Sequence, residues 1–253
     1  MSVTRRDLIR VAGVAPILVA SRALGAAKGP PKPSLTPIDA TRGTRLYPTF
    51  AQDPWWTTEP VTGWDLPSLT SPSITSLGAS LVPDGATTII DSRNTPRLGM
   101  FTRAYFQFST RPLQAPPGLH GVQTLYGVVS AAIHCVEAHS RINATLAMQI
   151  VVHRPDKTVR GVPLPLWHDT LEFTVGTLTS RAAQNWTLTP VDCLDGDVIA
   201  INLGIRADNQ TGTLARTVGF AIHESEPGDI VNFNDPALLN TWVDFSAPLQ
   251  FEQ

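Results

Sequence analysis

Alternation of apolar residues with a period of two is the feature of this sequence that most restricts its fold. Between Asp197 and Ala207 every second position is apolar, so one face of an extended chain would carry Ile199, Ile201, Leu203, Ile205 and Ala207. The same alternation recurs at Leu146–Val152 and Val218–Ile222. Successive side chains of a strand point to opposite sides, so each segment predicts a β-strand with one apolar face.

Five further segments with turn residues between them are predicted to be strands: Met100–Ser109, Thr124–Ala132, Leu171–Val175, Ala183–Leu188 and Thr241–Ser246. No long stretch after the N-terminal segment keeps the 3.6-residue period of an amphipathic helix. Strands with one apolar face each bury those faces when two sheets pack together. The sequence therefore predicts an all-β, antiparallel β-sandwich, jelly-roll-like, in a single domain at residues 44–253.

The composition fits one domain with a sizeable core and excludes two classes of protein. Hydrophobic residues make up 42% of the 253 residues and charged residues 16%, which excludes disorder caused by excess charge. The formal net charge is −2, and the basic residues are spread along the chain rather than gathered in a stripe. Nucleic acid is therefore not an expected partner.

Residues 1–27 have the layout of an export signal. A charged start that contains Arg5 and Arg6 precedes the ten residues Val11–Ala20, which are mostly apolar, and small residues follow at Ala23–Ala26. The apolar run is too short for a stable membrane span, which needs about 20 residues. The paired arginines in Thr-Arg-Arg-x-Leu-Ile resemble the twin-arginine export motif. We expect cleavage and a periplasmic or extracellular protein; the alternative is an N-terminal helix or docking arm that stays attached.

A proline-rich segment at residues 28–43 follows the signal-like segment. Four prolines lie between Lys28 and Ala40. Proline disfavours helices and central strands, so this segment is predicted to be an extended linker.

Five segments occur in order through the rest of the chain: Thr44–Tyr47, Trp64, Phe106–Phe108 followed by Arg111–Leu113, Gly196–Ala207, and Trp242–Ser246. With them the chain resembles a family of β-sandwich proteins that are encoded among the virion and tail genes of tailed phages and are also found in bacterial genomes. The resemblance implies a jelly-roll-like fold and a structural or surface-recognition role. It supplies no catalytic residue.

Cys135 and Cys193 are the two cysteines of the chain. In an oxidising compartment they are candidates for a disulfide, which would stabilise the fold by roughly 4 kcal/mol. The alternative is two separate buried thiols that pack as small apolar groups.

Two sets of residues are candidates for binding a metal ion. Cys135, Glu137 and His139 would project from one face of a strand, although structural zinc usually has four ligands. Asp195 and Asp197, in the same region as Asp192, Asp208 and Asn209, offer oxygen ligands for a structural calcium ion. An ordinary polar turn explains each set as well. No other cofactor is predicted.

Trp55, Trp56 and Trp64 are the candidate ligand-binding residues. They lie in a segment rich in proline, threonine and glycine. An exposed aromatic face stacks well against a sugar ring, whereas the alternative is that these tryptophans cover an open end of the core.

No catalytic apparatus is recognisable, so we do not expect an enzyme. His168–Asp169 and His223–Glu224 are local pairs without a serine nucleophile in a G-x-S-x-G setting, and phosphate-binding glycine loops are absent from the sequence. The leading hypothesis is an exported surface protein that binds a surface polysaccharide or a protein partner, or assembles into a surface structure as a homo-oligomer. The alternatives are a phage virion or tail component with an uncleaved arm and a secreted hydrolase.

Replacement of Arg5 and Arg6 by lysines is expected to trap the precursor in the cytoplasm, because the twin-arginine route recognises the motif rather than its charge. Cell fractionation measures the trapping, and mass spectrometry of the protein finds an N-terminus near Ala26 if the signal is cleaved. Unchanged export of the variant, or a surviving Met1 or Ser2, contradicts this prediction.

Overall fold

The computed structural model describes residues 43–49, 63–65, 74–83, 88–94, 99–116, 118–210, 216–223, 228–230 and 239–252. These residues form thirteen strands and no helix: β1 (Thr44–Thr49), β2 (Thr75–Ser80), β3 (Thr88–Asn94), β4 (Gly99–Ser109), β5 (Val122–Leu125), β6 (Val128–Glu137), β7 (Ile142–His153), β8 (Val159–Glu172), β9 (Thr179–Thr187), β10 (Val191–Leu194), β11 (Val198–Asn209), β12 (Thr217–His223) and β13 (Trp242–Phe245). None of the described residues belongs to a helix long and apolar enough to cross a membrane.

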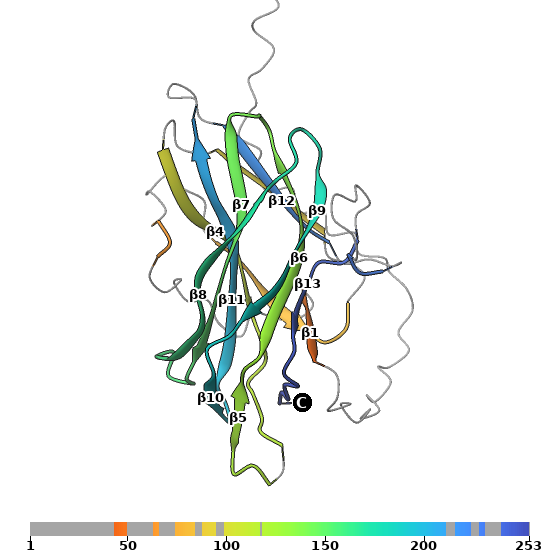
Figure 1. Cartoon of the computed structure of the whole chain (residues 1–253). Coiled ribbons are helices and arrows are strands. Elements are labelled where there is room, and N and C mark those ends of the chain that lie inside the picture. The colour runs from red at the N-terminus through yellow and green to blue at the C-terminus, as the bar shows by residue number, and fades with distance from the viewer. Residues whose placement is uncertain are drawn as a thin grey trace, which may run out of the picture.

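Eleven strands form one hydrogen-bonded sheet, ten of them along a single path and β9 paired with β6 beside it. The sheet divides into two layers, because β1 belongs to both (Figure 1). Residues Thr44–Leu46 pair with β13, whereas Tyr47–Thr49 pair with β2. The layer beyond β13, here called sheet A, contains β13, β6, β9, β12 and β3. The layer beyond β2, called sheet B, contains β2, β4, β11, β7 and β8, while β5 and β10 form a separate small sheet.

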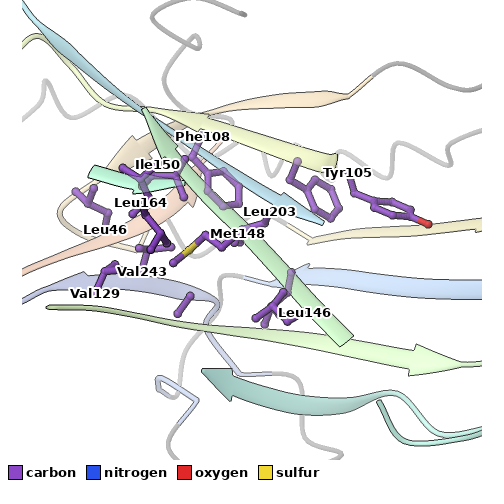
Figure 2. Packing of buried hydrophobic residues seen from close by; sticks show 14 of the residues in the cluster. Leu46, Tyr105, Phe108, Val129, Leu146, Met148, Ile150, Leu164, Leu203 and Val243 are labelled. Carbon is purple, nitrogen blue, oxygen red and sulfur yellow. The ribbon is translucent and has the colours of Figure 1, made fainter. Parts of the chain in front are cut away.

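The core lies between the two sheets, as the sequence predicts for a sandwich. Tyr105 of β4 and Phe220 of β12 belong to different sheets, and their ring centroids are 4.9 Å apart. At the edges, Trp167 of β8 and Trp186 of β9 have centroids 3.8 Å apart. Figure 2 shows buried side chains from β1, β4, β6, β7, β8, β11 and β13 that pack together between the sheets. The all-β sandwich is therefore confirmed.

One strand pair departs from the predicted antiparallel arrangement. β2 and β4 pair in parallel, from Thr75 opposite Phe106 to Gly78 opposite Ser109. The strand between them in sequence, β3, lies in sheet A, so the chain leaves sheet B after β2 and returns to it in the same direction. Parallel neighbours need such a crossover, whereas antiparallel neighbours can be joined by a tight hairpin.

Two predicted strands differ most from the structure in their bounds. The segment predicted at Thr124–Ala132 divides at Gly127, whose φ of 85° ends β5 and precedes β6. Of the segment predicted at Leu171–Val175, only Leu171 and Glu172 belong to a strand, as the end of the much longer β8, while Val175 forms an isolated bridge with Glu137. The earlier part of β8 contains Pro163 and Pro165, which weaken a strand prediction from sequence. Proline is tolerated there because β8 pairs only with β7 among the described strands.

The predicted apolar face of β11 is confirmed, but the opposite face of this strand is also buried. Asn202 lies directly opposite Gln107 of β4 and Gln149 of β7. Gln107 Nε2 donates a hydrogen bond to Asn202 Oδ1 (2.7 Å), and Asn202 Nδ2 donates one to Gln149 Oε1 (3.4 Å). All three side chains are 1% exposed. The one-sided interpretation of β11 is therefore wrong, and three amides form a row, here called the amide ladder, across the outer face of sheet B.

Trp64 covers the amide ladder. Thr102 of β4 fixes the neighbouring Asp65: Asp65 N donates to Thr102 O (2.8 Å) and Thr102 N donates to Asp65 Oδ2 (2.5 Å). Trp64 Nε1 then donates to Gln149 Oε1 (3.0 Å). The indole lies so close to Gly204 that an added Cβ there would be 2.7 Å from Trp64 Cζ3. An added Cβ would come closer still to the backbone oxygen of Arg103, so a residue without a side chain is required at position 204.

We expect Leu203→Ala to lower the free energy of unfolding by about 2–5 kcal/mol, because it leaves a cavity in the core. Asn202→Ala is expected to cost about 1–3 kcal/mol, because it removes buried hydrogen bonds to two glutamines. Urea denaturation of the purified protein measures both losses, with the exposed Thr170→Ala as a control that changes stability by less than about 0.5 kcal/mol. An Asn202→Ala protein as stable as the control would contradict the buried ladder.

Candidate functional site

A group of polar and aromatic side chains lies on the outer face of sheet A. Arg45 of β1 is directly opposite Asp244 of β13, and the next pair, Leu46 and Val243, lies in the core. Because neighbouring residues of a strand point to opposite sides, Arg45 and Asp244 lie on the face away from the core. We call this group the Arg45 cluster, and its members are Arg45, Tyr47, Asp229, Asn240, Trp242 and Asp244.

Asp229 accepts three hydrogen bonds within the Arg45 cluster. Its Oδ2 atom accepts from Arg45 Nη1 (2.7 Å) and from the Tyr47 hydroxyl (2.9 Å). Its Oδ1 atom accepts from Asn240 Nδ2 (3.2 Å). Arg45 also donates through Nη2 to Asp244 Oδ2 (3.0 Å), so one guanidinium joins two carboxylates.

The two segments that bring Asp229 and Asn240 to sheet A are held together through their backbones. Ile230 N donates to Asn240 O (3.2 Å), and Asn240 N donates to Gly228 O (2.9 Å). Below the polar groups, Ile230 packs with Tyr47, Trp242 and Ala132 in a second, small apolar cluster. Trp242 Nε1 donates to Ile230 O (3.0 Å), which fixes the indole.

The charged side chains of the cluster reach solvent, whereas the ring of Trp242 beneath them is buried. The side chains of Arg45, Asp229 and Asp244 are 36%, 23% and 35% exposed. Trp242 is 7% exposed, and the Arg45 guanidinium carbon lies 4.3 Å from its ring centroid. The cluster therefore offers charged donors and acceptors to a ligand, but no open aromatic face for stacking.

The pKa values of two members of the cluster, Tyr47 and Arg45, are raised above their ordinary values. Burial, followed by the hydrogen bond to Asp229, raises the pKa of Tyr47 to about 12, so the hydroxyl remains a donor. Burial alone would lower the pKa of Arg45, but hydrogen bonds to Asp229 and Asp244 outweigh it and raise that pKa above its ordinary value. Tyr47 therefore stays a hydrogen-bond donor and Arg45 stays positively charged in the physiological range.

Sequence patterns alone did not identify the Arg45 cluster. A local signal exists in each strand. Arg45 and Tyr47 share one face of β1, and Trp242 and Asp244 share one face of β13, while the residues between them lie in the core. The pairing of β1 with β13 joins the two ends of the domain and has no local signature. Asp229 lies outside the named strands, at an isolated bridge with Asn240.

The three tryptophans proposed as ligand-binding residues are not shown to act together. Trp55 and Trp56 lie outside the described residues. Trp64 is half-buried, and its indole donates to Gln149 and packs at Gly204. These contacts support the alternative in which Trp64 covers the protein interior, and sugar stacking remains a prediction.

The cysteines are two separate buried thiols in this structure, which is the second of the two alternatives above. Cys135 lies in β6 and Cys193 in β10, and both are free. Burial raises the pKa of Cys193 to about 12 and the pKa of Cys135 further. Neither thiol is therefore a thiolate nucleophile near neutral pH.

The proposed ligands Cys135, Glu137 and His139 do not converge. A Glu137 carboxylate oxygen accepts a hydrogen bond from Ala144 N (2.5 Å), and His139 Nδ1 accepts one from Arg141 N (3.0 Å) in the following turn. Among the residues that the structure describes, no group of three or more histidine, cysteine and carboxylate side chains is placed to hold a metal ion.

The proposed calcium ligands Asp195 and Asp197 also make separate contacts. Asp195 Oδ1 accepts from Ala115 N (2.6 Å), and Asp197 Oδ2 accepts from Leu194 N (2.8 Å). The buried Asp197 also forms an ion pair with Arg160, which supplies the positive charge that a cation would otherwise provide. This arrangement favours the alternative in which both residues stabilise turns.

The first histidine pair, His168 and Asp169, does not have the contacts of a catalytic pair. His168 Nε2 contacts Arg206 Nη1, and burial together with the arginine charge lowers the pKa of His168. Asp169 Oδ1 accepts from the backbone of Thr170 and Leu171 and so serves a local turn. The side chains of the second pair, His223 and Glu224, lie outside the described residues.

Comparisons with known proteins find structural similarities with low TM-scores and low sequence identity. No family model matches the chain, and no curated protein matches it. A CocE/NonD family hydrolase from Staphylococcus aureus is 7% identical with a TM-score of 0.42, over 83% of this chain and 37% of that chain. A structure of infectious bursal disease virus Gt strain is 14% identical with a TM-score of 0.30, over 75% and 42%. The VP2 subviral particle of the same virus is 13% identical with a TM-score of 0.22, over 85% and 58%. This chain spans less than two thirds of each of these proteins.

Glu137 predicts a pH dependence of stability. The side chain is 1% exposed, and burial raises its pKa from 4.5 to about 7. The folded state then keeps a proton that the unfolded chain releases, so this contribution is present below pH 4.5 and is lost as the pH rises to about 7. Glu137→Gln is expected to remove the loss, which is at most about 1.4 kcal/mol per pH unit.

Urea denaturation of wild type, Glu137→Gln and the exposed control Glu252→Gln between about pH 4.5 and 8 measures this effect. Comparison with wild type cancels the titration of the other groups. The prediction is contradicted if the difference in free energy of unfolding between wild type and Glu137→Gln is the same at all pH values.

Proposed function

We propose that this chain is an exported, non-catalytic surface protein whose β-sandwich binds a surface polysaccharide at the Arg45 cluster. The observation that carries the proposal is the half-exposed set of two carboxylates joined by one guanidinium, with Asp229 and Asp244 both held by Arg45. Sugar hydroxyls both donate and accept hydrogen bonds, so adjacent hydroxyls fit an alternating set of carboxylate and guanidinium groups.

The geometry favours recognition through polar contacts. Each carboxylate oxygen has two lone pairs, so Asp244, which is 35% exposed, has acceptor capacity beyond its bond to Arg45. The Trp242 ring is covered by Arg45, so stacking contributes little at this site. Because the Arg45 cluster is held by Tyr47 and Asn240, binding requires little ordering of side chains, which supports affinity.

The state of the other reactive groups supports a binding role over a catalytic one. The Cys135 and Cys193 thiols are buried with raised pKa values. His168 is in contact with an arginine rather than with a carboxylate that would orient it as a general base.

Export and the phage-type resemblance are proposed from sequence, because residues 1–42 lie outside the described residues. The twin-arginine-like segment with Arg5 and Arg6 supports export to the cell surface. The alternative to an exported protein is a virion or tail protein that retains its N-terminal arm. The two differ in the N-terminus of the native protein.

A glycan array probed with the purified protein tests the binding site. We expect Asp244→Asn to weaken binding about tenfold, which corresponds to about 1.4 kcal/mol, because it removes one charged acceptor. Thermal stability changes little, since a half-exposed ion pair contributes about 0–1 kcal/mol. The matched control is Asp192→Asn, an exposed aspartate of β10 that accepts one hydrogen bond from Thr124 (2.7 Å).

Two results would contradict the proposal. If the wild-type protein binds no glycan, the sugar-binding function fails. If glycans bind equally to wild type, Asp244→Asn and Asp192→Asn, the protein binds sugar at some other place than the Arg45 cluster.

A further inference from the structure

Three strands lie at the edges of the two sheets. In the described part of the chain, β3 pairs only with β12, β8 only with β7 and β9 only with β6. An edge strand leaves a row of backbone donors and acceptors without strand partners, and proteins commonly protect such edges with prolines, bulges or charges. The three edges differ in how far they are protected.

The edges at β8 and β9 are irregular. β8 contains Pro163 and Pro165, and its pairing with β7 shifts register at four places. β9 has a register shift against β6, and Asn185 within it has a φ of 60°. Each of these features interrupts the regular spacing of backbone groups that a further strand would need.

The edge at β3 is regular. Its seven residues pair without a shift along β12, from Thr88 opposite His223 to Asn94 opposite Thr217. The sequence Thr-Ile-Ile-Asp-Ser-Arg-Asn contains no proline and no glycine. The backbone of β3 is therefore suited to accept another strand, and its two charged residues, Asp91 and Arg93, determine which strand fits.

We propose that β3 joins two copies of this chain, paired antiparallel about a twofold axis at Ser92. In such a pair each residue lies opposite the residue that is equally far on the other side of the axis. An axis at Ser92 puts Asp91 opposite Arg93 of the second copy, and it does so twice. Opposite charges directly across two strands stabilise the pairing.

The neighbouring registers are disfavoured by the same two residues. An axis at Asp91 puts this residue opposite its own copy, and an axis at Arg93 does the same for the arginine. Like charges directly opposite destabilise a strand pair. An axis at Ile90 puts Asp91 opposite Ile89 and forms no charge pair. Ser92 is thus the axis position, among these four, that the charges select.

The pairing has a consequence for the Arg45 cluster. A twofold axis between antiparallel edge strands is perpendicular to the sheet, so sheet A continues from one copy to the other with its outer faces on the same side. The two Arg45 clusters, on β1 and β13 of each copy, then face the same way. If the proposed function holds, a polymer would meet two sites at once, which increases its avidity. The pairing itself does not depend on that function.

Sedimentation equilibrium of the purified protein between about 1 and 100 µM tests the pairing. We expect a wild-type mass of two copies. Asp91→Arg alone and Arg93→Asp alone are each expected to give the mass of one copy, because each puts like charges opposite one another. An equimolar mixture of the two variants is expected to recover the mass of two copies, because each strand then meets one of opposite charge.

Association of the two variants in the mixture would show that each variant is folded and that the charges act across the interface. Asp156→Arg, in the turn between β7 and β8, is the matched charge control and leaves the mass at two copies. A wild-type protein that stays at the mass of one copy overturns the proposal. Single variants that pair as wild type does, or a mixture of natively folded variants that does not associate, overturn it as well. Glycan binding is measured separately, so its failure would leave this result unchanged.

Discussion

The pairing of β11 with β4 on one side and β7 on the other is the constraint on which the rest of this structure depends. The register runs without interruption along the whole of β11 against β7, from Val198 to Asn209. This strand is buried on both faces, so each polar group on it needs a partner inside the protein. Asn202 meets that requirement only because Gln107 and Gln149 occupy the two positions directly opposite. Trp64 and the absence of a side chain at Gly204 complete the cover.

Sheet B is therefore covered by the protein itself on both faces at its centre. The outer face of sheet A carries the Arg45 cluster, where two carboxylates and a guanidinium reach solvent above a covered Trp242. Its edge at β3 has a regular backbone, whereas β8 and β9 are irregular. Side chains held at the surface by a rigid scaffold are consistent with the binding role that we propose.

The sequence allowed prediction of those parts of the fold that local alternation determines. Ile201 and Leu203 lie in the core as expected, because the period of two specifies which residues share a face. Alternation cannot reveal whether the opposite face is covered. The burial of Asn202 depends on strands far away in sequence and on Trp64.

The candidate site shows the same limit. Arg45 and Asp244 come from strands near opposite ends of the domain, and only the β1–β13 register brings them together. The metal hypotheses rested on residues close in sequence, whose side chains make other contacts in the structure. The disulfide hypothesis rested on the presence of two cysteines and an oxidising compartment, and Cys135 and Cys193 are separate buried thiols. The burial of β11 is measured most directly by hydrogen exchange followed by mass spectrometry. We predict that backbone amides of residues 200–206 exchange more slowly than those of the small β5–β10 sheet, at a rate set by global unfolding. Exchange of the β11 amides as fast as that of β10 would contradict the account.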